Sequence, residues 1–121
     1  MATPIRILAV DDDPNMHRLY ELYLSLNVFD ITCVSTARSA LQKLGSDKYD
    51  LVITDIQMPQ MDGITFIKEI RKSKNNIPTI IISASGAHTV ASQASTSGAN
   101  MVLDKPFEQE ELIDSIEKLL S

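Results

Sequence analysis

Five short apolar runs recur along the chain, and the intervals between them carry apolar residues at helical spacing. The runs cover residues 5–10, 31–34, 51–54, 79–82 and 101–103. Most are rich in Val and Ile and have the length of a strand, and the first and fourth are nearly continuous in hydrophobicity. Such continuity is typical of strands that are covered on both faces in a parallel sheet. We therefore predict five strands.

The intervals predict helices over residues 14–27, 36–44, 64–70, 88–97 and 110–120. Asp13 is placed to cap the first helix ahead of Pro14, and Gly45 is placed to end the second. Strict alternation of strands and helices implies right-handed crossovers and a doubly wound, parallel five-stranded sheet. No linker or repeat interrupts the pattern, so residues 1–121 are expected to form a single α/β domain of the (βα)5 type.

Composition narrows the class of protein further. The 121 residues include 11 Lys and Arg against 16 Asp and Glu, which gives a formal charge of -5 and disfavours direct binding to nucleic acid or to anionic lipid. No segment approaches the roughly 20 apolar residues of a membrane span. A single cysteine, Cys33, fits a reducing compartment. We expect a cytoplasmic protein without nucleic-acid or membrane contacts.

Polar side chains follow the predicted strands at the point where each strand ends. Asp11 and Asp12 follow the first run, Asp55 the third, Ser83 the fourth and Lys105 the fifth. The carboxyl ends of parallel strands meet at one edge of a sheet, where open α/β proteins bind ligands. The sequence therefore predicts three carboxylates, a hydroxyl and an ammonium group in one crevice.

Three converging carboxylates repel one another unless their pKa values rise or a hard divalent cation binds. Mg2+ fits a shallow crevice, because it keeps several waters and is held by one or two carboxylates together with phosphate oxygens. A carboxylate beside such a cation can attack a phosphoryl group. Lys105 would then neutralise phosphoryl oxygens, and Ser83 would donate a hydrogen bond to one of them.

Other polar residues have simpler interpretations. His17 and His88 lack carboxylate or cysteine companions at ligand spacing, so we interpret them as exposed helix histidines. Asp13 is interpreted as a helix cap and Cys33 as a small apolar strand residue. Asp104 is expected to be solvated, since successive residues of a strand point to opposite sides.

Four motifs together resemble the receiver domain of bacterial two-component response regulators over essentially the whole chain. They are Val10-Asp11-Asp12-Asp13, the stretch from Leu51 to Pro59 that runs into Met61-Asp62-Gly63, Ile82-Ser83-Ala84, and Lys105-Pro106-Phe107. The resemblance implies a flavodoxin-like fold with strand order 2-1-3-4-5.

The resemblance also implies a role for each matching residue. Asp55 takes the place of the phosphoacceptor, Asp12 that of the more direct Mg2+ ligand, and Asp11 that of a carboxylate acting largely through water. The main-chain carbonyl of Gln57 takes the place of the third protein ligand. Lys105 matches the family's lysine, whose bond to the following proline is typically cis.

One position departs from the family pattern. Ser83 occupies the place of the switch hydroxyl, but Val102 stands where many receivers carry an aromatic residue in the fifth strand. A valine has one restricted torsion and no hydroxyl, so it cannot report phosphorylation through a large rotamer change. Switching is therefore expected to depend on Ser83 and on residues 85–97.

The function implied is that of a signalling module and not of an enzyme with a separate substrate. A histidine kinase or histidine phosphotransfer protein would donate the phosphoryl group, and the domain would catalyse only its own phosphorylation and dephosphorylation. The downstream effector is unknown, and the protein is expected to be a monomer or a weak dimer through the face of the fourth helix, fifth strand and fifth helix.

Two alternatives use a similar sheet. A small phosphatase of the haloacid-dehalogenase type would place a second acid two residues after its nucleophile, where this chain has Gln57. A flavodoxin-like cofactor carrier would place a Ser-, Thr- or Gly-rich phosphate loop after the first strand. This chain has three aspartates there, which repel a phosphate unless a cation intervenes.

Overall fold

The computed structural model describes residues 4–24, 29–83 and 98–121. The strands of this part are β1 (Ile5–Val10), β2 (Phe29–Val34), β3 (Leu51–Asp55), β4 (Thr79–Ser83) and β5 (Met101–Asp104). Its helices are α1 (Pro14–Leu24), α2 (Ala37–Ser46), α3 (Gly63–Lys72) and α5 (Gln109–Leu120). The helix expected over residues 88–97 lies outside the described residues. None of the described helices is long and apolar enough to cross a membrane.

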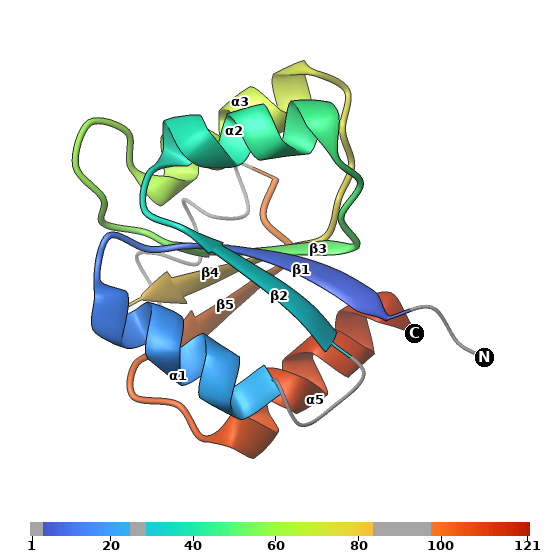
Figure 1. Ribbon diagram of the computed structural model, residues 1–121. Coiled ribbons are helices and arrows are strands. Elements are labelled where there is room, and N and C mark those ends of the chain that lie inside the picture. The colour runs from blue at the N-terminus through green and yellow to red at the C-terminus, as the bar shows by residue number, and fades with distance from the viewer. Residues whose placement is uncertain (1–3, 25–28, 84–97) are drawn as a thin grey trace.

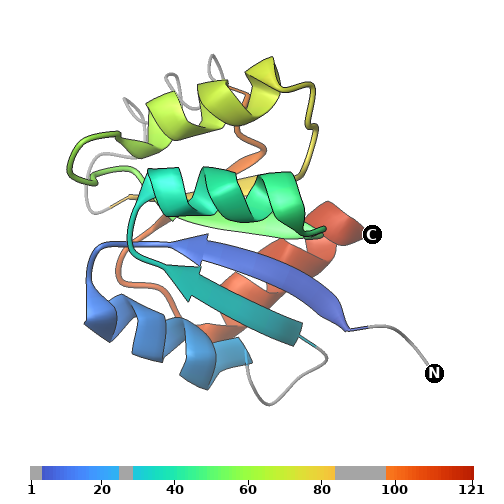
Figure 2. The same ribbon diagram turned by 45° about the horizontal axis from the view of Figure 1, so that its top comes forward.

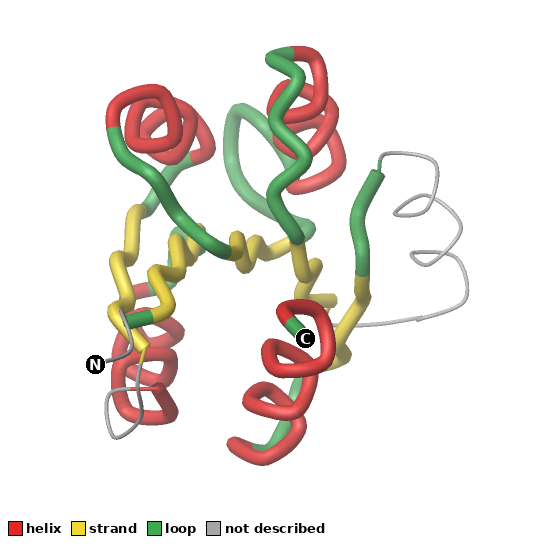
Figure 3. The backbone as a smooth tube through the Cα atoms, turned by 90° about the vertical axis from the view of Figure 1, so that its right-hand side faces the viewer, coloured by secondary structure: helices red, strands yellow, loops and turns green. Residues whose placement is uncertain are grey.

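The five strands form one parallel sheet in the order β2-β1-β3-β4-β5. Helices α1 and α5 cover one face of this sheet, and α2 and α3 cover the other (Figures 1 and 3). The predicted doubly wound fold and strand order are thus confirmed. The chain turns to one side after β1 and to the other after β3, so the loops that follow these two strands diverge and open a crevice between them.

The core has two layers because neighbouring residues of the central strands point to opposite faces. In β1, Ile7 and Ala9 pack with α1 and α5, whereas Leu8 and Val10 pack with α2 and α3. Two buried faces explain the continuous apolar run in the sequence. The edge strand β2 is only half-buried, so it can hold a polar residue, Asp30. Because Asp30 interrupts the apolar pattern, the apolar run in the sequence starts two residues after Phe29, where the strand begins.

The predicted helix ends are correct at one position and wrong at another. Asp13 caps α1, since its Oδ1 accepts a hydrogen bond of 2.9 Å from the Asn15 N–H. Gly45 does not end α2 but lies inside it, and the Asp47 N–H still donates to the Lys43 carbonyl at 2.8 Å. The helical hydrogen bonds therefore continue past the glycine, whose open surroundings impose no other conformation.

Candidate functional site

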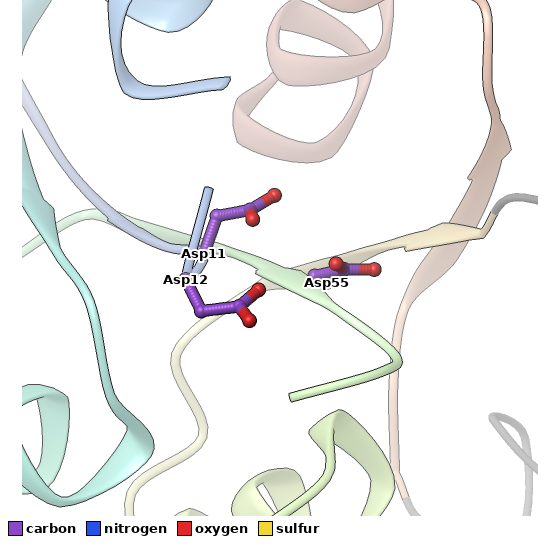
Figure 4. A group of neighbouring side chains, drawn as sticks. All are labelled: Asp11, Asp12 and Asp55. Atoms are coloured by element: carbon purple, nitrogen blue, oxygen red, sulfur yellow. The ribbon is translucent and has the colours of Figure 1, made fainter. Parts of the chain in front are cut away.

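Three carboxylates meet at the carboxyl edge of the sheet, which is the edge where the strands end. Asp11 and Asp12 lie on the loop after β1, and Asp55 is the last residue of β3. One carboxylate oxygen from each lies within 4.8 Å of the others. Figure 4 shows the three side chains gathered where β1 and β3 end. We refer to these three residues as the acidic cluster.

The loop after β1 is tied down by main-chain hydrogen bonds. The Asp11 N–H donates to the Val34 carbonyl at 3.1 Å, and the Asp11 carbonyl lies 2.6 Å from Nε2 of His17. The Asp11 side chain turns back onto the loop, where its Oδ1 accepts the Asp13 N–H at 2.9 Å. β2 and α1 thus both hold the loop that carries two of the carboxylates.

Lys105 reaches the acidic cluster from the end of β5. Its Nζ lies 3.6 Å from Oδ2 of Asp55 and 4.0 Å from Oδ2 of Asp11. The Lys105 N–H donates to the Ser83 carbonyl at 2.7 Å, and the bond from Lys105 to Pro106 is cis, as the resemblance implied. The ion pairs place one ammonium group against two of the three carboxylates, and no ion pair to Asp12 is found among the described residues, so the site keeps an excess of negative charge.

Among the three carboxylates, that of Asp11 lies in the least favourable environment for a negative charge. Its side chain is buried, and its Oδ2 has no hydrogen-bond partner among the described residues. Burial raises the pKa of Asp11, and the nearby Asp55 carboxylate raises it further, although the Asp13 N–H and Lys105 act in the opposite direction. The cluster therefore favours the uptake of a positive charge, either a proton or a cation.

The N-terminus of α3 packs directly on the backbone of Asp55. A Cβ on Gly63 would overlap the Asp55 main-chain oxygen, and the Gly63 N–H donates to the Ile56 carbonyl at 2.9 Å. Asp62 caps the helix by accepting the Thr65 N–H at 2.8 Å. Asp62 and Gly63 belong to one of the sequence motifs, but the motif did not reveal that this glycine allows the helix to approach the site.

The remaining predicted residues lie close to this edge. Ser83 is buried at the end of β4, and the Gln57 N–H lies 3.4 Å from Oδ1 of Asp55. Val102 lies half-buried in β5 and packs against a small cluster formed by Ile67 and Ile81. The structure therefore brings Ser83 and Gln57 to the region of the acidic cluster, while the position of the usual aromatic residue is filled by an aliphatic contact.

Two further interpretations are confirmed. Asp104 is exposed, and Cys33 lies half-buried in β2, where burial raises the pKa of its thiol to about 11. The interpretation of His17 as an exposed residue is wrong. It is half-buried, and its ring reaches back to the Asp11 carbonyl. No sequence motif signals a contact between a helix side chain and a main-chain oxygen, and His88 lies outside the described residues.

The fold and the site together define a flavodoxin-like α/β protein with an acidic cluster and a lysine at its topological switch point. The chain belongs to the response regulator receiver domain family, whose sequence model matches residues 7–117. Membership makes it a phosphoacceptor module of two-component signalling.

Similar proteins support this assignment. A CpxR homolog of Haemophilus influenzae, a transcriptional regulatory protein, is 37% identical over 95% of this chain and 50% of its own length. The response regulator MprA of Mycolicibacterium vanbaalenii is 32% identical over 97% of this chain and 51% of its own length. The chain thus spans about half the length of these curated relatives.

Solved structures show the same fold. The receiver domain of the Francisella response regulator 1452 superposes with a TM-score of 0.90 at 31% identity, covering 96% of each chain. The chemotaxis response regulator CheY4 of Vibrio cholerae superposes with a TM-score of 0.91 at 26% identity, covering 98% of this chain and all of its own.

Proposed function

We propose that this chain receives a phosphoryl group on Asp55 from a histidine kinase or a histidine phosphotransfer protein, in a Mg2+-dependent reaction that the domain itself catalyses. The main support is the placement of the Asp55 carboxylate, which ends a buried strand within the acidic cluster and lies 3.6 Å from Nζ of Lys105. A nucleophilic oxygen, a cation-binding set of oxygens and an ammonium group are thereby adjacent.

The residues fit a magnesium ion. They supply oxygen ligands, carry excess negative charge, and include a buried carboxylate oxygen, Oδ2 of Asp11, that has no hydrogen-bond partner in the described part of the chain. Asp12 and Asp55 would bind the ion directly, Asp11 largely through water, and Gln57 through its main-chain carbonyl. The ion would offset the charge of the carboxylates and of the incoming phosphoryl oxygens.

The chain's own groups carry out the transfer. An oxygen of Asp55 attacks phosphorus, and the bond between phosphorus and the donor's imidazole nitrogen breaks, so the electron pair stays with the donor. The Lys105 ammonium group neutralises charge on the phosphoryl oxygens, and the Ser83 hydroxyl donates a hydrogen bond to one of them. The Gln57 N–H, 3.4 Å from Oδ1, helps to orient the Asp55 carboxylate.

The phosphorylated domain would act on a partner. A phosphoryl group adds a charge of roughly -1.5 to -2, which shifts the balance between two conformations of the surrounding loops. The curated relatives extend beyond the part that this chain matches, and we propose an effector, on the same or another chain, as the recipient of the signal. The face that includes β5 and α5 would provide the docking surface or a weak dimer contact.

The two alternative functions lack support at the site. Gln57, beside Asp55, offers an amide where a haloacid-dehalogenase-type phosphatase would need its second acid. The loop after β1 presents Asp11 and Asp12 to the crevice, so it repels the phosphate that a flavodoxin-like carrier would bind there.

The test is phosphorylation by a small phosphodonor. The protein is incubated with acetyl phosphate and Mg2+, and its intact mass is measured. The wild type should gain one phosphoryl group, and it should gain none when EDTA is present. Asp55→Asn should gain none, whereas Asp104→Asn, a matched change at an exposed aspartate near Lys105, should behave like the wild type. The proposal fails if the wild type gains no mass or if Asp55→Asn gains as much.

A further inference from the structure

The carboxylates of the acidic cluster are not held equally. Oδ1 of Asp11 accepts the Asp13 N–H at 2.9 Å, and Asp55 is held by the Gln57 N–H and by Lys105. Asp12 is exposed, and no hydrogen bond or ion pair holds its carboxylate within the described ranges. The position of the Asp12 carboxylate therefore depends on the backbone that carries it.

That backbone is fixed by a side chain from α1. Nε2 of His17 lies 2.6 Å from the carbonyl oxygen of Asp11. A carbonyl oxygen only accepts hydrogen bonds, so Nε2 must carry a proton and donate it. The Asp11 carbonyl belongs to the planar peptide unit that ends at Cα of Asp12. A bond that fixes this oxygen therefore also fixes the Asp12 Cα, from which the side chain extends.

The histidine is itself well anchored. It lies one turn into α1, whose start is set by the bond from the Met16 N–H to the Asp13 carbonyl at 3.0 Å. The thiol of Cys33 lies 3.9 Å from the His17 carbonyl, so β2 contacts the helix at the same level. A half-buried ring on a packed helix holds its partner more rigidly than a solvated one would.

We propose that His17 is a positioning residue that orients Asp12 for binding of the divalent cation. The inference rests on the proposed function, since it assigns His17 a part in building the magnesium site. His17 does not touch the ion or the phosphoryl group. It acts through the peptide unit between Asp11 and Asp12, and losing the bond should weaken cation binding more than it weakens the fold.

The test compares two substitutions of nearly equal size. His17→Gln places an amide N–H close to the position of Nε2, whereas His17→Met fills similar space without a donor. Mg2+ binding is measured by calorimetry, and the melting temperature is measured in EDTA and in a fixed, subsaturating Mg2+ concentration. We expect His17→Met to raise the Mg2+ dissociation constant about 3- to 10-fold, which corresponds to the free energy of one hydrogen bond. The dissociation constant of His17→Gln should stay within about twofold of that of the wild type.

The melting temperatures separate positioning from a merely structural role. A positioning role predicts that the rise in melting temperature caused by a fixed, subsaturating Mg2+ concentration is smaller in His17→Met than in His17→Gln. A structural role would lower the melting temperature equally with and without Mg2+, and that result overturns the inference. His17→Asn, whose amide is one methylene too short to reach Asp11, serves as a second donor-deficient variant if His17→Met does not fold.

The outcome for the wild type keeps the two proposals distinct. Failure of the wild-type protein to bind Mg2+ contradicts the proposed function and this inference together. Binding by the wild type with equal dissociation constants for His17→Gln, His17→Met and His17→Asn contradicts only the role of His17.

Discussion

The two edges of the sheet place charged side chains in opposite environments. At the carboxyl edge, three carboxylates lie together, the Lys105 ammonium group pairs with two of them, and Oδ2 of Asp11 is buried without a hydrogen bond. At the amino edge, where the strands begin, the guanidinium group of Arg71 is surrounded by acceptors. Its nitrogens donate to the Gly98 carbonyl at 2.8 and 3.2 Å, to the Asn75 carbonyl at 3.0 Å and to Oδ1 of Asn100 at 3.3 Å.

The amino edge is also linked to the start of the strands. Oδ1 of Asn100 accepts the Thr79 N–H at 2.9 Å, and the Arg71 guanidinium group lies 3.4 Å from the Thr79 hydroxyl. Arg71 thus joins the end of α3, the helix that lies beside α2 in Figure 2, to the first residue of β4 and to the approach to β5. Gly98 has a φ of 97°, and a Cβ there would crowd the Arg71 side chain, so a glycine is required.

This difference means that the amino edge contributes to stability, whereas the carboxyl edge serves the proposed function. Buried polar groups stabilise a fold when each finds a partner, and they cost stability when one is left unsatisfied. The satisfied Arg71 network therefore supports the fold, whereas the acidic cluster lowers stability and keeps the negative charge that the proposed Mg2+ site requires. Substitutions at the two edges should accordingly change stability and phosphorylation in opposite patterns.

The largest effect on phosphorylation is expected from Asp11→Asn at the carboxyl edge. The asparagine keeps the acceptor for the Asp13 N–H but removes a charge that burial and Asp55 disfavour. Without Mg2+, the variant should be more stable than the wild type by about 1 kcal/mol. Its phosphorylation by acetyl phosphate should fall at least about tenfold, since a cation-binding carboxylate is lost. Urea denaturation in EDTA and intact mass measure the two changes.

The pH dependence supplies the check for Asp11→Asn. The fold raises the pKa of Asp11 above its ordinary value of 3.8, so the folded protein favours the protonated carboxyl. The wild type therefore loses stability as the pH rises from about 3.8 to above the raised pKa of Asp11. The stability gained by the variant should thus be small below about pH 4 and largest at neutral pH. Saturating Mg2+ should reverse the order, because about 100 times the dissociation constant adds about 2.7 kcal/mol to the wild type alone.

The largest loss of stability is expected from Arg71→Met at the amino edge. The change removes several hydrogen bonds to a charged group and leaves the Gly98 carbonyl without its donor, which should lower the free energy of unfolding by about 2–3 kcal/mol. Phosphorylation at a temperature where the variant is folded should equal that of the wild type. Lys68→Met, on an exposed position of α3, is the matched control and should change neither property. A loss of phosphorylation in folded Arg71→Met would contradict the separation of the two edges.

The sequence predicted the acidic cluster because its members obey a local rule. Asp11 and Asp55 each follow an apolar run directly, Lys105 follows another after one intervening residue, and parallel strands end at the same edge. The same reasoning predicted the layers of helices, because it rests on positions relative to strands, which the hydrophobic pattern reveals without any knowledge of side-chain contacts. The strand order, in contrast, followed from the resemblance to receiver domains.

The amino-edge network and the His17 contact follow no such rule. Arg71 and Gly98 are 27 residues apart, and an arginine near the end of a helix has many possible partners. His17 and Asp11 are close in sequence, but their bond joins a ring to a main-chain oxygen, which residue types do not encode. Gly45 shows the converse error, because a residue that often ends helices was placed inside one by the hydrogen bonds around it.

The smallest effect is expected from Arg6→Met, which tests whether burial sets the value of an amino-edge arginine. Arg6 donates to the Lys48 carbonyl at 2.7 Å, stacks 4.7 Å from the Tyr49 ring centre and pairs with Asp30 at 3.7 Å, but its side chain is 38% exposed. Water can replace many of these contacts, so the free energy of unfolding measured by urea denaturation should fall by about 0.5–1 kcal/mol. Phosphorylation should be unchanged. High salt should shrink the difference only in part, because it screens the ion pair and not the bond to the carbonyl. A loss as large as that of Arg71→Met would mean that the number of contacts, and not their burial, determines stability at this edge.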